Sequence, residues 1–151
     1  MDVKYVNPFL SGVVEVLGTM AGVALEAGKP YLKQQTLAEG DISGVIGLSG
    51  AAEGSLAVTF HFGLIQAVMR GMLGDEISAI DDAVRDAVGE LTNMISGAAR
   101  RELSEKGLGL RAGIPRIYDG HGHCIEHAAS PVLAVPFSSE YGYAVIEVAL
   151  R

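Results

Sequence analysis

The sequence has no tryptophan, a single cysteine and only five prolines among its 151 residues, and 6% of the residues are aromatic. With only Cys124 available, an internal disulfide is excluded and a packed core must hold the fold together. Hydrophobic residues make up 49% and charged residues 19%, which is the balance of a globular chain rather than a disordered one. We expect one domain over residues 1–151, since no linker-like stretch divides the chain.

Basic runs and long apolar runs are also missing. The formal net charge is -7 and no basic run exceeds Arg100-Arg101, which argues against a nucleic acid partner because phosphates require a basic surface. No stretch approaches the roughly 18 apolar residues of a membrane span. The first ten residues lack the basic and apolar segments of a signal peptide. We therefore expect a cytoplasmic protein that binds neither nucleic acid nor membranes.

Hydrophobic periodicity predicts three helices. The first begins where Asn7 precedes Pro8, a pattern typical of an N-cap followed by proline at the first helical position, and it runs to about Ala27. A short helix over 64–73 and a long helix over 81–106 follow, each closed by a glycine.

Segments rich in β-formers lie between and after these helices. The predicted strands are 31–37, 42–48, 55–60, 110–114, 122–127, 132–137 and 143–150. The segment 49–54 is rich in turn residues, so 42–48 and 55–60 should form a hairpin. The order of elements predicts an α+β fold in which the two long helices pack on one face of a mainly antiparallel sheet.

The two halves of the chain resemble each other. Residues 15–22 can be aligned with 90–97, since each segment begins with Glu, ends with Gly and has Val two residues before the Glu. Strands follow the helix in both halves, which is typical of a duplicated helix-plus-sheet unit. Gly18 stands in the first copy where the second copy has Asn93.

The helix predicted over 81–106 separates apolar from polar positions. Glu90 and Asn93 leave one face about one turn apart. Gly89 and Gly97 also point outward, and since glycine inside a helix costs about 1 kcal/mol relative to alanine, close approach of a partner would compensate. On spacing alone, a solvated polar face is the alternative interpretation. The opposite stripe, expected to pack on the sheet, comprises Val84, Val88, Leu91, Ile95 and Ala98.

Seven segments carry a resemblance to a known family: 7–9, 28–33, 72–74, 86–97, 103–107, 120–123 and 131–137. The most specific is Asp86-Ala-Val-Gly-Glu-Leu-Thr-Asn-Met-Ile-Ser-Gly97. In these segments the chain resembles the CheX branch of the CheC/CheX/FliY phosphatases. That family hydrolyses the aspartyl phosphate of CheY-type response regulators in chemotaxis and two-component signalling. The resemblance spans nearly the whole chain.

The resemblance implies a role for each residue of the exposed pair. Asn93 would orient the attacking water, because a carboxamide donates and accepts hydrogen bonds without adding negative charge beside the phosphoryl group. Glu90 would pair with the regulator's active-site lysine, and Asp86, Gly89 and Gly97 would contact the partner. No cofactor is expected in this chain, since the Mg²⁺ that neutralises the phosphoryl charge would be bound by the regulator.

The first copy of the repeat lacks the amide. Because Gly18 has no side chain to orient water, we expect one active site per chain, with Glu15 outside the chemistry. The resemblance to the CheX branch also implies a homodimer formed through the sheets. A non-catalytic adaptor or flagellar-switch-type module that binds a regulator without hydrolysing it is the alternative function.

Four potential metal ligands lie close together in the sequence: His121, His123, Cys124 and His127. In an extended strand the three histidines share a face, but the outer two would lie roughly 20 Å apart, too far for one ion. We therefore expect surface histidines on a hairpin and no metal site.

Overall fold

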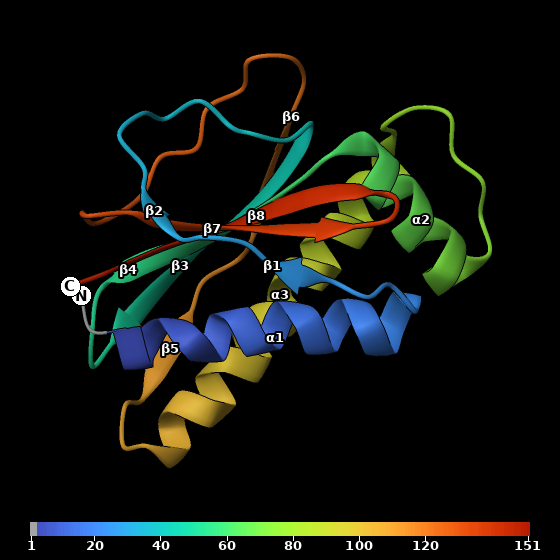
Figure 1. Ribbon diagram of the computed structural model, residues 1–151. Coiled ribbons are helices and arrows are strands. Elements are labelled where there is room, and N and C mark those ends of the chain that lie inside the picture. The colour runs from blue at the N-terminus through green and yellow to red at the C-terminus, as the bar shows by residue number, and fades with distance from the viewer. Residues whose placement is uncertain (1–2) are drawn as a thin grey trace.

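Three helices pack on an eight-stranded sheet in the computed structural model, which describes residues 3–151 (Figure 1). The helices are α1 (Val3–Ala21), α2 (Phe62–Leu73) and α3 (Asp82–Glu105). The strands are β1 (Glu26–Ala27), β2 (Tyr31–Leu32), β3 (Ile42–Gly50), β4 (Gly54–Phe60), β5 (Leu110–Ala112), β6 (Arg116–Asp119), β7 (Leu133–Ser139) and β8 (Gly142–Leu150). The predicted α+β fold is confirmed. None of the helices described is both long and apolar enough to cross a bilayer.

The sheet order is β1-β7-β8-β4-β3-β5, with β2 also paired to β7 and β6 to β3. The predicted hairpin is present as β3 and β4, with Ile42 opposite Phe60. The short strands that follow α1 pair with β7 of the second half, and those that follow α3 pair with β3 of the first half. Each half thus supplies a central hairpin and lends its short strands to the other half, as expected for a duplicated unit.

The start of α1 differs from its prediction. The helix is already formed at Val3, so Asn7 is not an N-cap and Pro8 lies inside the helix. Proline is tolerated there because it removes only one backbone hydrogen bond, close to the helix start. Val6 is 2% exposed, and its burial against the core stabilises the turn that precedes the proline.

The end of α1 was also predicted wrongly. The helix stops at Ala21, because Gly22 adopts a φ of +68° and donates its N–H to Gly18 O at 3.1 Å. The prediction extended the helix to Ala27, but Glu26–Ala27 instead forms β1 and pairs with Ser138 and Phe137 of β7. The backbone N–H and C=O groups at the edge of β7 need hydrogen-bond partners. Pairing with them outweighs the helical spacing of the few apolar residues in this segment.

Two predicted strands are mostly loop. The segment 31–37 contributes β2 and Leu37, which forms a single bridge with Cys124 of the segment 122–127. Gly120 and Gly122 adopt φ values of +102° and +76°, which turn the chain away from an extended path. These two loops lie over the sheet face opposite α1 and α3 (Figure 1).

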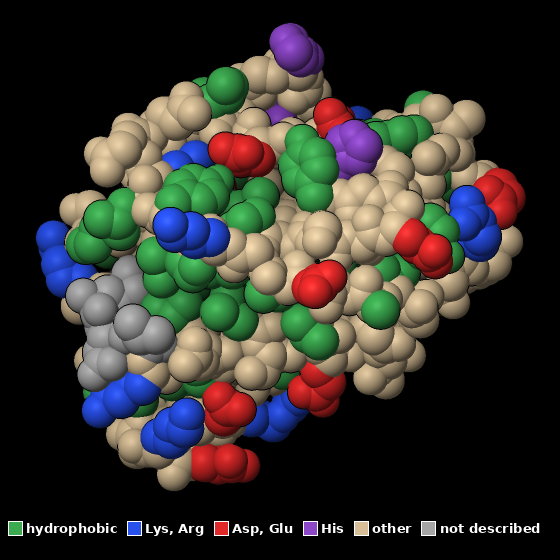
Figure 2. Space-filling view, in the orientation of Figure 1, with side chains coloured by type: hydrophobic (Ala, Val, Ile, Leu, Met, Phe, Trp, Pro, Cys, Tyr) green, Lys and Arg blue, Asp and Glu red, His purple; other side chains and the backbone are tan. Residues whose placement is uncertain are grey.

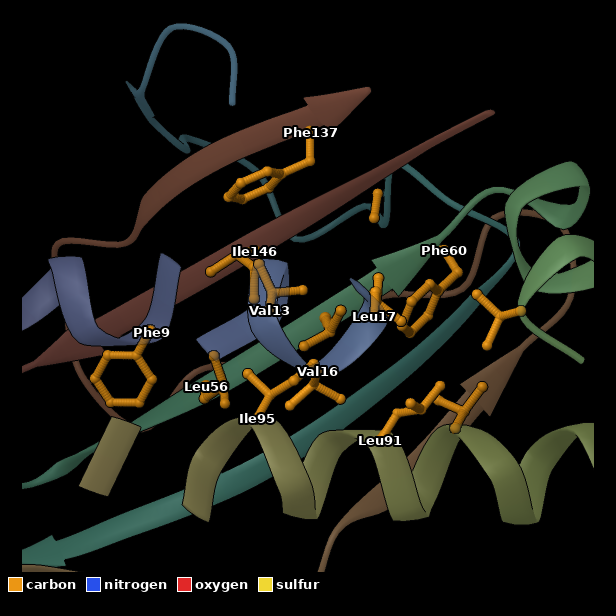
Figure 3. Packing of buried hydrophobic residues seen from close by; sticks show 14 of the residues in the cluster. Phe9, Val13, Val16, Leu17, Leu56, Phe60, Leu91, Ile95, Phe137 and Ile146 are labelled. Carbon is orange, nitrogen blue, oxygen red and sulfur yellow. The ribbon is translucent and has the colours of Figure 1, made fainter. Parts of the chain in front are cut away.

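A buried stripe of α3 sets the rotation of that helix. Val84, Val88, Leu91 and Ile95 are fully buried, and Figure 3 shows Leu91 and Ile95 directed from α3 into the core. Ala99 continues the stripe, whereas Ala98, predicted to do so, is half-buried beside α1. Helices α1 and α3 approach closely at Gly12, where a Cβ would lie only 3.1 Å from Ile95 O; glycine, which has no Cβ, permits this approach.

Candidate active site on helix α3

Helix α3 presents Glu90 and Asn93 to the outside. Its first turn is capped by Asp81, whose carboxylate accepts a hydrogen bond from Val84 N at 3.0 Å. With the opposite stripe buried, both polar side chains are exposed, as predicted, and point about 60° apart around the helix. Neither side chain makes a hydrogen bond or ion pair within residues 3–151, so both are available to a partner.

Asn93 also lines a groove between α1 and α3, with a volume of about 330 Å³. The other lining residues of this α1–α3 groove are Glu15, Val16, Thr19, Met20, Met94, Gly97, Ala98 and Arg101. Glu90 lies outside the groove, on the adjoining part of the helix surface. A partner that reaches both residues therefore has to cover α3 and the groove edge together.

The three predicted partner-contact residues have different surroundings. Asp86 is exposed one turn before Glu90, and Gly97 lines the α1–α3 groove. Gly89 is only half-exposed, because a Cβ there would lie 3.8 Å from Ile117 Cδ1 of β6. Gly89 therefore lies partly under β6, and its role as a partner contact stays a prediction.

Gly18 occupies the matching position on α1. It is exposed, and the nearest atom to a Cβ there would be Val23 O, 4.0 Å away. Packing does not require glycine at this position. Glu15 is exposed and lines the groove opposite Asn93, so the first copy of the repeat keeps its carboxylate without the amide.

An ion pair holds α3 against β6 near the site. Arg85 donates to both carboxylate oxygens of Asp119, at 3.0 Å from Nε and 3.1 Å from Nη2. Hydrogen bonding to this guanidinium lowers the pKa of Asp119 from its usual value of 3.8. The bidentate geometry fixes the N-terminal half of α3 relative to the sheet edge.

The histidines weighed as metal ligands have separate partners. His123 Nε2 lies 2.7 Å from Ser43 Oγ, and His127 Nε2 lies 2.9 Å from Glu147 Oε1. His121 is exposed. In the part of the chain that the structure describes, no three His, Cys, Asp or Glu side chains are gathered closely enough to hold a metal ion.

A buried polar cluster on the sheet face away from α3 was not predicted from the sequence. Glu147 of β8 is fully buried and accepts hydrogen bonds from His127 Nε2 and from Lys33 Nζ, the latter at 2.7 Å. His127 Nδ1 lies 2.8 Å from Ser55 Oγ. We call these four residues the Glu147 cluster. A glutamate inside an otherwise apolar strand was the available signal, because a buried carboxylate requires partners.

Known proteins match this chain over most of its length. The family model described as chemotaxis phosphatase CheX matches residues 42–138. A CheC-like superfamily protein from Shewanella sp. PV-4 is 44% identical, with a TM-score of 0.94 over 100% of this chain and 99% of that chain.

Two further relatives have a known partner or activity. CheX from Borrelia burgdorferi, solved in complex with CheY, BeF₃ and Mg²⁺, is 29% identical, with a TM-score of 0.82 over 97% of both chains. The CheY-P phosphatase CheX from Thermotoga maritima is 28% identical over 139 residues, which are 91% of this chain and 89% of the relative. With exposed Glu90 and Asn93 on the matched segment, this chain belongs to the chemotaxis phosphatase CheX family.

Proposed function

We propose that this chain hydrolyses the aspartyl phosphate of a CheY-type response regulator in chemotaxis or another two-component pathway, and that Asn93 and Glu90 act on that substrate. The observation that carries the proposal is an exposed Glu-x-x-Asn pair, without a partner among residues 3–151, on α3 of a CheX family member. The Thermotoga maritima relative is a CheY-P phosphatase, and the Borrelia burgdorferi relative forms a complex with CheY. The same class of substrate is therefore the one to test.

Asn93 is the residue that we assign to the attacking water. Hydrolysis of an acyl phosphate requires a water held in line with phosphorus, and most of the catalysis comes from positioning and charge stabilisation. The carboxamide can accept a hydrogen bond from this water and donate one to a phosphoryl oxygen. Because the side chain is exposed at the edge of the α1–α3 groove, it can enter the active site of another protein.

Glu90 is assigned to the partner rather than to proton transfer. Its exposed carboxylate lies one turn before Asn93 and can pair with the regulator's active-site lysine, which would hold Asn93 in line with the phosphoryl group. Exposed Asp86 and groove-lining Gly97 would extend this contact surface, with a smaller contribution from Gly89. The Mg²⁺ that neutralises the phosphoryl charge would be bound by the regulator, so this chain supplies no cofactor.

A phosphate-release assay with purified chain, phosphorylated regulator and Mg²⁺ tests the proposal. The parent should speed release, and Asn93→Ala should lose at least about a hundredfold of that acceleration, as expected for a residue that acts mainly in the transition state. Its melting temperature should be unchanged, since the Asn93 side chain makes no hydrogen bond in the described part of the chain. Asn7→Ala, an exposed asparagine on α1, is the matched control.

The same assay separates the phosphatase from the adaptor. Full activity of Asn93→Ala would refute the assignment of Asn93. Binding that depends on Glu90 with an unchanged phosphate lifetime would show instead that the chain is a non-catalytic regulator-binding module.

We also propose that the chain acts as a cytoplasmic homodimer that associates through the sheet. Ile114 is 87% exposed and Tyr118 39% exposed on the sheet face away from α3, where they provide apolar surface. An interface there would leave Glu90 and Asn93 open to the regulator. Ile114→Ser should therefore yield a monomer in light scattering with unchanged phosphatase activity, whereas an unchanged dimer would place the interface elsewhere.

A further inference from the structure

The α1–α3 groove is lined by one guanidinium group, that of Arg101. Arg101 is exposed, and its guanidinium makes no hydrogen bond or ion pair within residues 3–151. The other two arginines of α3 are engaged, since Arg85 binds Asp119 and Arg100 donates to Ser96 Oγ at 3.1 Å. Arg101 is therefore available to bind an anionic group from outside the chain.

Arg101 extends back along α3 toward Asn93. A Cβ at Gly97 would lie 3.8 Å from Arg101 Nη1, so the guanidinium is next to the turn between residues 97 and 93. One helical turn is about 5.4 Å along the axis. The glycine leaves space above the helix backbone, and the cation lies within reach of a molecule that contacts Asn93.

The remainder of the groove is mostly apolar. Met20 of α1 is 40% exposed, Met94 of α3 is half-buried, and both line the groove. Methionine side chains adapt to irregular partner surfaces because they are flexible and polarisable. The groove can therefore receive an apolar side chain as well as an anionic group.

Charge is distributed unevenly along the exposed face of α3. Asp86 and Glu90 lie before Asn93, whereas Arg100 and Arg101 lie after it. Figure 2 shows basic side chains, together with acidic ones, at the lower edge of the molecule, where Figure 1 places the C-terminal part of α3. A partner with a cation near Glu90 and an anion near Arg101 would be bound in one orientation along the helix.

We infer, building on the proposed function, that the α1–α3 groove docks a loop of the phosphorylated response regulator that presents a carboxylate to Arg101 and an apolar side chain to Met20 and Met94. The groove is continuous with Asn93, so a regulator whose phosphoryl group reaches Asn93 covers the groove as well. Arg101 acts as a positioning residue: it orients the regulator along α3 and takes no part in the chemical step.

Steady-state kinetics with Arg101→Gln test this inference. The variant should raise KM about 5- to 20-fold with kcat nearly unchanged, as expected when binding is lost equally from the ground and transition states. The difference should shrink as salt rises, because exposed charges are screened. Arg111→Gln, which removes the same charge from an exposed position on β5, should leave KM unchanged.

Direct binding makes the test independent of turnover. The regulator activated with beryllofluoride and Mg²⁺ should bind Arg101→Gln and Met20→Ser at least about fivefold more weakly than the parent and Arg111→Gln. Equal affinity across all four proteins would overturn the inference. Loss of the dimer in Arg101→Gln would show instead that a second copy of the chain occupies the groove.

The two sets of variants test the docking role of the groove and the catalytic role of Asn93 separately. Loss of activity in Asn93→Ala together with parental kinetics and binding in Arg101→Gln would refute only the docking role of the groove. Full activity in Asn93→Ala would refute the catalytic assignment, while the binding measurement would still decide the docking role.

Discussion

His127 Nε2 lies 2.9 Å from Glu147 Oε1, in a contact whose side chains are 4% and 0% exposed. Because the carboxylate oxygen can only accept, Nε2 carries the hydrogen. The second carboxylate oxygen binds Lys33 at 2.7 Å, so the buried negative charge has a counter-charge and both its oxygens are satisfied. Glu147 thereby fixes two loops from distant parts of the chain onto the outer face of the sheet.

Replacing Glu147 with alanine should lower the free energy of unfolding by about 3–5 kcal/mol, because Lys33 would stay buried without a counter-charge. The double variant Lys33→Met/Glu147→Leu should recover much of this loss, since apolar side chains remove both charges together. Urea denaturation measures the change, with exposed Glu53→Ala as the control. A loss below about 0.5 kcal/mol in Glu147→Ala would contradict the role given to this cluster.

Gly44 should be intolerant of alanine. A Cβ there would overlap Thr92 Oγ1 and lie 3.1 Å from Thr92 Cβ, so β3 and α3 would have to separate. We expect Gly44→Ala to cost about 1–3 kcal/mol, the usual penalty of overpacking. Gly47→Ala, on the same strand with no atom within 4 Å, is the matched control and should cost little. Thr92→Ala should rescue part of the Gly44→Ala loss in thermal melts, and its failure to do so would rule out this clash.

Gly18→Asn should create a second Glu-x-x-Asn pair, with Glu15 as its carboxylate. The side chain fits, since the nearest atom to its Cβ is 4.0 Å away, and asparagine has a higher helix propensity than glycine. In the Asn93→Ala background we expect a measurable part of the phosphate-release activity to return. Gly18→Ala in that background fills the same space without an amide and should restore nothing. If Gly18→Asn is folded yet equally inactive, the first copy lacks more than the amide.

The Arg85 and Asp119 pair should make stability depend on acid. Because the pKa of Asp119 is lowered in the folded state, its contribution is fully present above the usual carboxyl value of 3.8. It is lost as the pH falls through the lower folded pKa. Asp119→Asn should therefore be less stable at pH 7 and lose less stability than the parent below pH 4 in denaturant titrations. Exposed Asp75→Asn is the control, and parental acid sensitivity in Asp119→Asn would refute this coupling.

The sequence predicted α3 well because its signals are local. A regular apolar stripe, the Asp81 cap and the turn at Gly107 all lie on or beside the helix, and they place Glu90 and Asn93 outside. The groove beside Asn93 was not predictable, since it depends on a helix crossing at Gly12 that joins distant parts of the chain.

The other features that the sequence did not predict also depend on contacts between distant parts of the chain. Pro8 and the residue before it resemble a helix start, but tertiary burial of the preceding turn overrides that local pattern. Strand β6 was not predicted because it is short and lies at an edge of the sheet. Of its apolar residues, only Ile117 faces α3. The partners of Glu147 lie in loops whose paths no local pattern specifies.

The exchange of short strands between the two halves affects how the chain folds during synthesis. β1 and β2 emerge from the ribosome early, but their partner β7 is among the last segments to be made. Until β7 arrives, the N-terminal half has unsatisfied edge strands and an incomplete core, the kind of surface that chaperones bind. Folding should therefore complete only once the C-terminal hairpin is available, and nascent chains truncated before β7 should remain sensitive to protease.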